Sequence, residues 1–169
     1  MSVREITGDI IRDAQGIICH QVNYQGVMGG GIAASIREKL LSSKQYIDYQ
    51  QHCDRYGAET LGTVSYCHCK GSVIVANMFC QNEESSGNGS FTNYDCMERC
   101  FKDVRKVAET WKHPVFIPGH IGCGIAGGDW TKVKYIIHKV FQGAKVPVTI
   151  VYWEKESWNI PSNDDLPFN

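Results

Sequence analysis

The sequence alternates short apolar runs with longer segments in which apolar residues recur at helical spacing. The short runs predict strands over residues 16–19, 63–69, 72–79, 115–117 and 148–153. The longer segments predict helices over residues 31–40, 46–56, 92–111 and 129–141, with Thr92 as the cap of the third and Gly57 ending the second. Such an alternation is typical of an α/β fold, in which helices cover a sheet.

Polar stretches lie between and after these elements. Residues 83–90 are polar and rich in glycine and serine, which predicts a loop. Residues 154–169 contain two prolines and few apolar side chains, which predicts an extended arm on the surface. We therefore expect one domain over residues 1–153, followed by a tail over residues 154–169.

The composition is that of an ordinary globular domain. Of the 169 residues, 43% are hydrophobic and 21% are charged, which suits a single core. The net charge is −1, from 17 basic and 18 acidic residues that are spread along the chain. This distribution excludes the broad electropositive face that binding to long nucleic acid requires.

The apolar runs are too short for a membrane span, which needs roughly 18 residues, and residues 1–6 lack the apolar region of a secretion signal. We therefore expect a cytoplasmic protein with no membrane partner, whose eight cysteines are reduced thiols. The closest approach to a metal cluster is Cys67-His68-Cys69, but in a strand the two cysteines face away from the histidine, and no C-x-x-C pair accompanies them. The sequence thus predicts neither a metal nor a cofactor.

Three consecutive glycines follow the first predicted strand. Gly29, Gly30 and Gly31 remove the side chains from the start of the helix over residues 31–40. The unpaired N–H groups there and the positive end of the helix dipole both favour an anion such as a diphosphate. A flexible turn or close helix packing is the alternative explanation.

A second glycine-rich loop follows the strand over residues 115–117. It contains Gly122, Gly124, Gly127 and Gly128, and it again opens a helix. No Lys-Ser/Thr pair follows these glycines, so the loop is not a P-loop, and the first loop lacks the G-x-G-x-x-G spacing of a Rossmann turn. Both loops together favour a nucleotide diphosphate held between them.

Residues 8–10, 20–33 and 121–130 carry a resemblance to a known family. They resemble the macro domain family, and the resemblance extends over residues 8–153. With His20 in the first segment and Trp130 in the last, the chain is most similar to the branch of ADP-ribose 1″-phosphate phosphatases, which is common in bacterial and phage proteins. The resemblance implies a three-layer α/β/α fold with a mixed central sheet, and ADP-ribose or a derivative as the ligand.

The resemblance also implies roles for individual residues. Asp9 accepts a hydrogen bond from the adenine amino group, and the backbone N–H of Ile10 meets the ring. Asn23 holds the hydroxyls of the distal ribose. An aromatic residue packs on the adenine; Tyr152 is the candidate, although the sequence leaves open whether Tyr152 or Trp153 meets the ring. The loops that hold the phosphates comprise Gly29, Gly30, Gly31 and Ile32 in the first segment, and Gly122, Cys123, Gly124, Ile125, Ala126 and Gly127 in the second.

His20 and Asp129 are the candidate catalytic residues. His20 is expected to end its strand at the edge that faces the ligand, where an imidazole can orient water or protonate a leaving oxygen. The alternative is a structural histidine. Asp129 is expected to position water near the distal ribose, with a helix cap as the alternative. We expect neither covalent chemistry at Cys123 nor a catalytic role for His120.

These features favour an enzyme that converts ADP-ribose 1″-phosphate to ADP-ribose and phosphate. An ADP-ribosyl hydrolase that acts on modified proteins or nucleic acids is one alternative. Members of the sister branch that remove ADP-ribose from acidic side chains pair a lysine with an aspartate, and Ala126 stands at the aspartate position here. The other alternative is a reader that binds ADP-ribose without catalysis.

Overall fold

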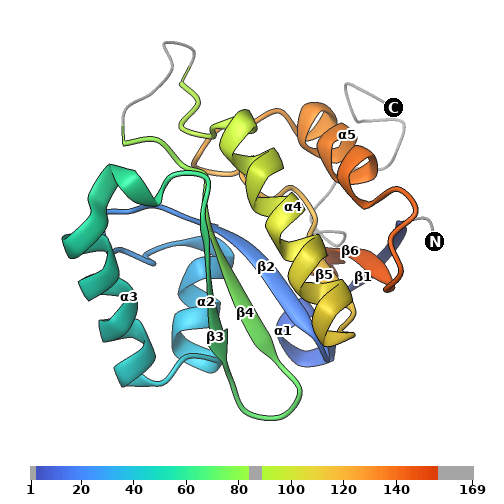
Figure 1. Cartoon of the computed structure of the whole chain (residues 1–169), viewed down its shortest axis with the longest axis horizontal. Helices are drawn as coiled ribbons and strands as arrows, with labels where there is room; N and C mark the ends of the chain where they lie inside the picture. Colours follow the sequence, from blue (N-terminus) through green and yellow to red (C-terminus); the bar gives the residue numbers. More distant parts are fainter. Residues whose placement is uncertain (1–2, 84–88, 156–169) are drawn as a thin grey trace.

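The computed structural model of the chain describes residues 3–83 and 89–155. The described strands form one mixed sheet, in the order β1-β6-β5-β2-β4-β3 (Figure 1). They are β1 (Arg4–Gly8), β2 (Ile17–Val22), β3 (Val64–His68), β4 (Ile74–Phe79), β5 (Val115–Pro118) and β6 (Val148–Trp153). All neighbouring pairs are parallel except β3 and β4, which form an antiparallel hairpin.

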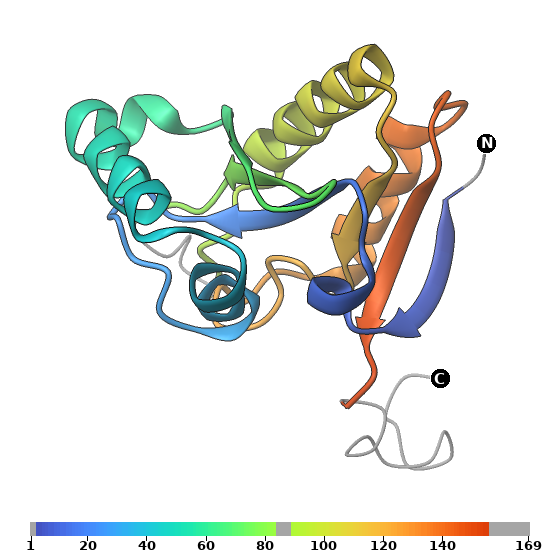
Figure 2. The same ribbon diagram turned by 90° about the horizontal axis from the view of Figure 1, so that it is seen from below.

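Helices cover both faces of this sheet. They are α1 (Ile10–Asp13), α2 (Gly31–Lys39), α3 (Ser43–Tyr56), α4 (Tyr94–Trp111) and α5 (Trp130–Phe141), with a 3₁₀ turn, η1 (Gly57–Thr60), after α3. The helices α4 and α5 lie on one side of the sheet, and α1 and α2 lie on the other (Figure 2). Tyr49 and Cys53 of α3 pack into the same apolar cluster as Ile36 of α2. The three-layer α/β/α fold expected from the resemblance is therefore confirmed.

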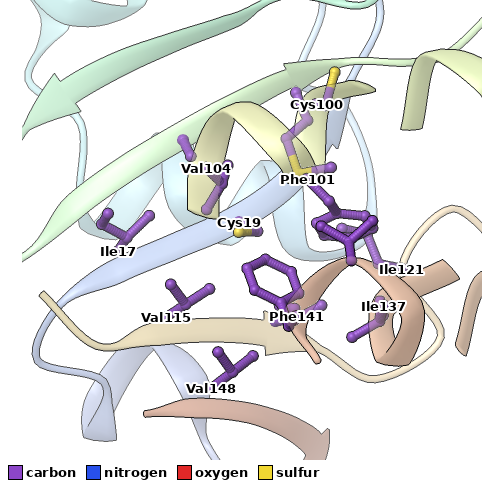
Figure 3. Close-up of a cluster of buried hydrophobic side chains, with 14 of the residues drawn as sticks. Ile17, Cys19, Cys100, Phe101, Val104, Val115, Ile121, Ile137, Phe141 and Val148 are labelled. Carbon is purple, nitrogen blue, oxygen red and sulfur yellow. The ribbon is translucent and has the colours of Figure 1, made fainter. Parts of the chain in front are cut away.

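The core consists of two apolar clusters, one on each face of the sheet. Phe101 of α4 and Phe141 of α5 meet Ile17 and Cys19 of β2 on the first face (Figure 3). Ile18 of β2 points to the second cluster, because successive side chains of a strand face opposite sides. Each buried phenylalanine or isoleucine contributes about 1.5–3 kcal/mol to folding.

The predicted strands and helices are all present, with differences at their ends. The third long helix, α4, is capped by Asn93 and not by Thr92: the side chain of Asn93 accepts from the N–H of Cys96 at 3.0 Å. The helix α3 begins at Ser43 and not at residue 46, because Ser42 and Gln45 form a reciprocal capping box.

The pattern missed the first two elements. Strand β1 and helix α1 together span only residues 4–13, and most side chains of this edge strand are exposed. The loop expected over residues 83–90 falls largely on residues 84–88, and the expected tail largely on residues 156–169, so both lie mostly outside the described residues. Within the described ranges, no helix is long and apolar enough to span a membrane.

Candidate functional site

The two glycine-rich loops face each other across a cavity of about 440 Å³ at the carboxyl ends of the parallel strands β2 and β5. In open α/β sheets ligands bind at this position, because the strand-to-helix loops meet there. The first loop connects β2 to α2, and the second connects β5 to α5. The cavity is lined by Gln21, Val22, Asn23, Val27, Gly29, Gly30, Gly31, Ile32, Ala33 and Gln81, and by residues 118–126.

The N-terminus of α2 opens into this cavity without a side-chain cap. Gly30 occupies the cap position and makes no side-chain hydrogen bond. The other described α-helices are each capped by a side chain, from Asp9, Ser42, Asn93 and Asp129. The first turn of α2 therefore offers N–H groups and the positive end of its dipole to an anion.

A second cavity, of about 400 Å³, continues the first along α2. The two share Gly31, Ile32, Pro118 and Gly119, so they form one cleft. The further lining residues of the second cavity are Asp9, Ile10, Ile11, Ser35, Lys39, Val151 and Trp153. The volumes of both parts, about 440 and 400 Å³, lie in the range of small-molecule sites.

Asn23 closes the first loop on itself. Its Oδ1 accepts from the N–H of Gln25 at 3.1 Å and from the hydroxyl of Tyr49 at 3.2 Å, and its Nδ2 donates to the carbonyl of Val27 at 3.0 Å. Asn23 lines the cavity, as expected for a residue near the distal ribose. Its side-chain amide, however, already serves to shape the loop.

The second loop is held by a chain of hydrogen bonds from β2. Gln21 Nε2 donates to Thr92 Oγ1 at 3.1 Å, and Thr92 Oγ1 donates to the carbonyl of Gly122 at 2.6 Å. The same carbonyl accepts from the N–H of Gly128 at 2.8 Å. Gly127 adopts φ 72°, and an added Cβ there would lie 2.7 Å from the carbonyl oxygen of Gly89. These contacts explain the glycines at the far end of the loop structurally.

His20 is inside the protein rather than at the edge of the cleft. It is completely buried in β2, and it does not line either cavity. Its Nε2 lies 2.6 Å from Oδ1 of Asn77, whose Nδ2 donates to Ser65 Oγ, so Nε2 carries the proton. Nδ1 has no hydrogen-bond partner in the described part of the chain.

Burial lowers the pKa of His20 to about 4, although the hydrogen bond to Asn77 acts in the opposite direction. The side chain is therefore neutral near pH 7 and out of reach of a ligand in the cleft. The expectation that His20 ends its strand at the ligand-facing edge is wrong, because β2 continues to Val22. Its placement is that of a structural histidine.

Three further expected residues lie outside both cavities. Asp129 is the exposed N-cap of α5, with Oδ1 accepting from the N–H of Thr131 at 2.9 Å. Gly127 lies where an added Cβ would meet the carbonyl oxygen of Gly89. Tyr152 faces α5 instead of the cleft: its ring packs on Trp130 and its hydroxyl donates to Glu5 at 2.6 Å.

Trp153 is the aromatic residue that lines the second cavity. It lies there together with Asp9 and Ile10, and the residue is 39% exposed. Asp9 caps α1 through Oδ1, which accepts from the N–H groups of Ile11 and Arg12. The structure thus brings Asp9, Ile10 and residues 29–32 and 122–126 together in one cleft, whereas Gly127 lies outside it. Of the two aromatic residues that the sequence left open, Trp153 lines the cleft and Tyr152 does not.

Sequence reasoning did not assign several lining residues. His120 borders the first cavity, with φ 63° and its ring 5.1 Å from that of Trp130. Ser35 and Lys39 line the second cavity. They follow Gly31 at intervals of four residues, and this spacing could have predicted from the sequence that all three lie on one side of the helix. Burial raises the pKa of the Cys123 thiol to about 11, with a further contribution from Asp129, so this lining cysteine is not a thiolate at neutral pH.

No protein-family model matches the chain, and none of the curated proteins matches it. Solved structures do. A protein of unknown function from Bacteroides thetaiotaomicron is 28% identical, with a TM-score of 0.79 over 90% of this chain and 98% of that one. The macrodomain of Mycobacterium tuberculosis DarG is 21% identical, with a TM-score of 0.73 over 89% of this chain and 96% of that one.

Thermosipho africanus DarTG in complex with ADP-ribose is 16% identical, with a TM-score of 0.69 over 95% of this chain and 42% of that longer one. These similarities agree with the strand order and the three layers described above. The chain therefore has the fold of the macrodomains.

Proposed function

We propose that this chain binds ADP-ribose or a derivative of it. The observation that carries the proposal is the continuous cleft, in which two glycine-rich loops flank the uncapped N-terminus of α2. Backbone N–H groups at a helix N-terminus suit a diphosphate. The complex of DarTG with ADP-ribose, a protein of the same fold, supports the choice of ligand.

In this proposal the diphosphate lies between Gly29–Ile32 and Gly122–Ala126. The adenine lies at the other end of the cleft, between Asp9 and Trp153. Asp9 Oδ1 is occupied by the cap of α1, which leaves its other carboxylate oxygen for the amino group of the base. The distal ribose then lies toward Asn23.

Isothermal titration calorimetry with ADP-ribose tests the proposal. We expect saturable binding of one ligand per chain. Ribose 5-phosphate, which lacks the base and the diphosphate, should bind roughly tenfold or more weakly, because it loses interactions in both parts of the cleft. Absence of heat at millimolar ADP-ribose would show that the cleft has another ligand.

We further propose that the chain hydrolyses ADP-ribose 1″-phosphate. Water cleaves the phosphate ester, inorganic phosphate leaves, and the sugar retains its hydroxyl at C1″. The glycine loops offer N–H donors for the charge on the phosphate, but a side chain has to move the proton. Among the described residues that line the first cavity, His120 is the only histidine, and it takes the role that the sequence suggested for His20.

Phosphate release from ADP-ribose 1″-phosphate tests this step, beside release of ADP-ribose from modified protein and from modified nucleic acid. His120→Ala should lower kcat by about 10²–10⁴-fold, the usual scale for loss of a general acid or base, with a smaller effect on KM. Turnover of only a modified macromolecule would favour the ADP-ribosyl hydrolase. Binding of ADP-ribose with no turnover of any substrate would favour the reader.

We also propose a cytoplasmic location. All eight cysteines are free in the structure, and Cys19, Cys80 and Cys100 are buried in the core, where reduced thiols act as small apolar side chains.

A further inference from the structure

One face of α2 forms a wall of the cleft over the whole length of the helix. Gly31 and Ile32 of the first turn border both cavities, and Ser35 and Lys39 border the second cavity alone. Gly31, Ser35 and Lys39 are spaced by four residues, so they lie along one side of the helix. A hydroxyl and an ammonium group therefore follow the uncapped N-terminus along the same wall.

Lys39 makes no hydrogen bond or ion pair with other described residues. A lysine in the last turn of a helix is ordinarily explained by the helix dipole. Arg37, in the same turn, is engaged: it lies 3.5 Å from Glu38 and its guanidinium lies over the ring of Tyr46. Lys39 instead borders the cavity with its charge unneutralised.

Lys39 is too far along α2 to pair with a diphosphate bound at the N-terminus of the helix. Lys39 lies eight positions after Gly31, which is roughly 12 Å along the axis at 1.5 Å per residue. Helical side chains lean toward the N-terminus, so the stem of Lys39 returns over the turn that holds Ser35. Both polar groups thus border the second cavity beyond the first turn of α2, where the diphosphate is proposed to lie.

The proposed ligand places its adenosine ribose there. A nucleotide with its diphosphate at Gly31 and its base between Asp9 and Trp153 must have the connecting ribose against this part of α2. Asp9 is the other charged residue among the described lining residues of the second cavity, and its Oδ1 faces the backbone of α1. Lys39 is therefore the one basic residue among the described residues that line this cavity.

We propose that Ser35 and Lys39 form a subsite for a phosphate ester on the adenosine ribose. The preferred ligand is thus an ADP-ribose that carries a phosphate on the 2′ or the 3′ hydroxyl of its adenosine half. The subsite rests on the proposed function, because the binding of ADP-ribose in the cleft brings the ribose to Ser35 and Lys39. The hydroxyl donates one hydrogen bond to the ester, and the ammonium supplies charge.

Calorimetry with ADP-ribose, its 2′-phosphate and its 3′-phosphate tests the subsite at about 20 mM salt. One ester should bind about 5-fold more tightly than ADP-ribose, the upper end for a charge pair that remains partly exposed. The preference should fall in 0.5 M salt, roughly the concentration at which screening becomes strong over a few ångströms. Whichever of the 2′- and 3′-phosphates binds more tightly identifies the ribose hydroxyl that carries the ester.

Lys39→Gln should remove the preference for the ester, and Lys39→Arg should retain most of it. Lys106→Gln is the matched control, because this lysine lies on α4 and borders a different surface hollow. Equal affinities for all three ligands, or a preference that persists in Lys39→Gln, would overturn the subsite while leaving ADP-ribose binding intact. Failure of all three ligands to bind would overturn the proposed function and the subsite together.

Discussion

At the scale of single residues, the environment of a side chain decides between chemistry and structure. His20 and His120 both lie near the carboxyl ends of the central strands. Only His120 borders the cleft, whereas His20 is enclosed in the sheet and bonded to Asn77. The position of a histidine in a sequence motif therefore does not by itself show whether the residue is catalytic or structural.

The buried His20 should make the protein sensitive to mild acid. Its folded-state pKa of about 4 lies below the ordinary value of 6.5, so the folded chain favours the neutral form. The stability that His20 contributes is complete above pH 6.5 and is lost as the pH falls toward 4. Between pH 7 and pH 5 this amounts to about 2 kcal/mol of unfolding free energy.

Urea unfolding of the parent and of His20→Gln at pH 7 and pH 5 measures this effect. Glutamine can still donate to Asn77 but does not titrate, so His20→Gln should lose much less stability between the two pH values. The exposed His138→Gln on α5 should behave like the parent. An equal pH dependence in the parent and in His20→Gln would mean that another group controls the transition.

Gly124 is a position in the cavity lining where a side chain can be added without a steric clash. An added Cβ there has no other atom within 4 Å, whereas one at Gly30 would approach Ile125 at 3.2 Å. Gly124→Glu should therefore fold normally and weaken ADP-ribose binding by about 10- to 100-fold, because its carboxylate repels the diphosphate at short range.

Gly124→Gln is the neutral control of nearly the same size. Titration calorimetry should show a smaller loss for the glutamine variant than for the glutamate variant, and the difference should shrink at high salt. If both variants bind ADP-ribose like the parent, the second loop does not hold the diphosphate.

At the scale of elements, the helix N-termini differ in whether a side chain caps their free N–H groups. The helix α5 is closed by Asp129 and α4 by Asn93, while α2 begins at a bare glycine. Thr92, which resembles a cap in the sequence, instead ties the second loop to Gln21. Thr92 and Asn93 are both capable of capping, and the tertiary contact of Thr92 decides between them.

Asp129→Ala should destabilise the protein by about 1 kcal/mol through loss of the cap of α5. Asp129→Asn should keep most of the stability, because its side-chain oxygen can still accept from Thr131. Urea unfolding of the two variants measures the difference. Undiminished stability of Asp129→Ala together with lost turnover would instead restore the catalytic role that the resemblance implies.

At the scale of the whole molecule, the cleft is assembled from segments far apart in the sequence. The carboxyl ends of β2, β5 and β6 meet at one edge of the sheet, and they bring residues 29–32, 118–126 and 153 together. A ligand that bridges these segments should stabilise the entire fold, because the unfolded chain cannot bind it.

ADP-ribose should therefore raise the melting temperature. At a concentration 100 times its Kd the expected stabilisation is about 2.7 kcal/mol, which corresponds to roughly 5–10 °C for a domain of this size. Differential scanning fluorimetry with increasing ligand measures the shift. A melting temperature that stays constant up to millimolar ADP-ribose would contradict binding to the folded state.

The sequence by itself determined most of the strands and helices and the places of the two glycine-rich loops. Apolar periodicity and glycine runs are properties of neighbouring residues, so the strands, the helices and the bare start of α2 follow from them. The same dependence on local periodicity explains why the short edge strand β1 was not predicted: most of its side chains are exposed and give little periodic signal.

Only the tertiary structure decided which side chains enter the cleft. Tyr152 and Trp153 are adjacent in β6 and must face opposite sides, but the packing of Tyr152 on Trp130 assigns Trp153 to the cavity. The burial of His20 and the place of Lys39 beside the second cavity likewise depend on strand order and on the helices that cover each face. These are contacts between distant segments, which local patterns of residues do not encode.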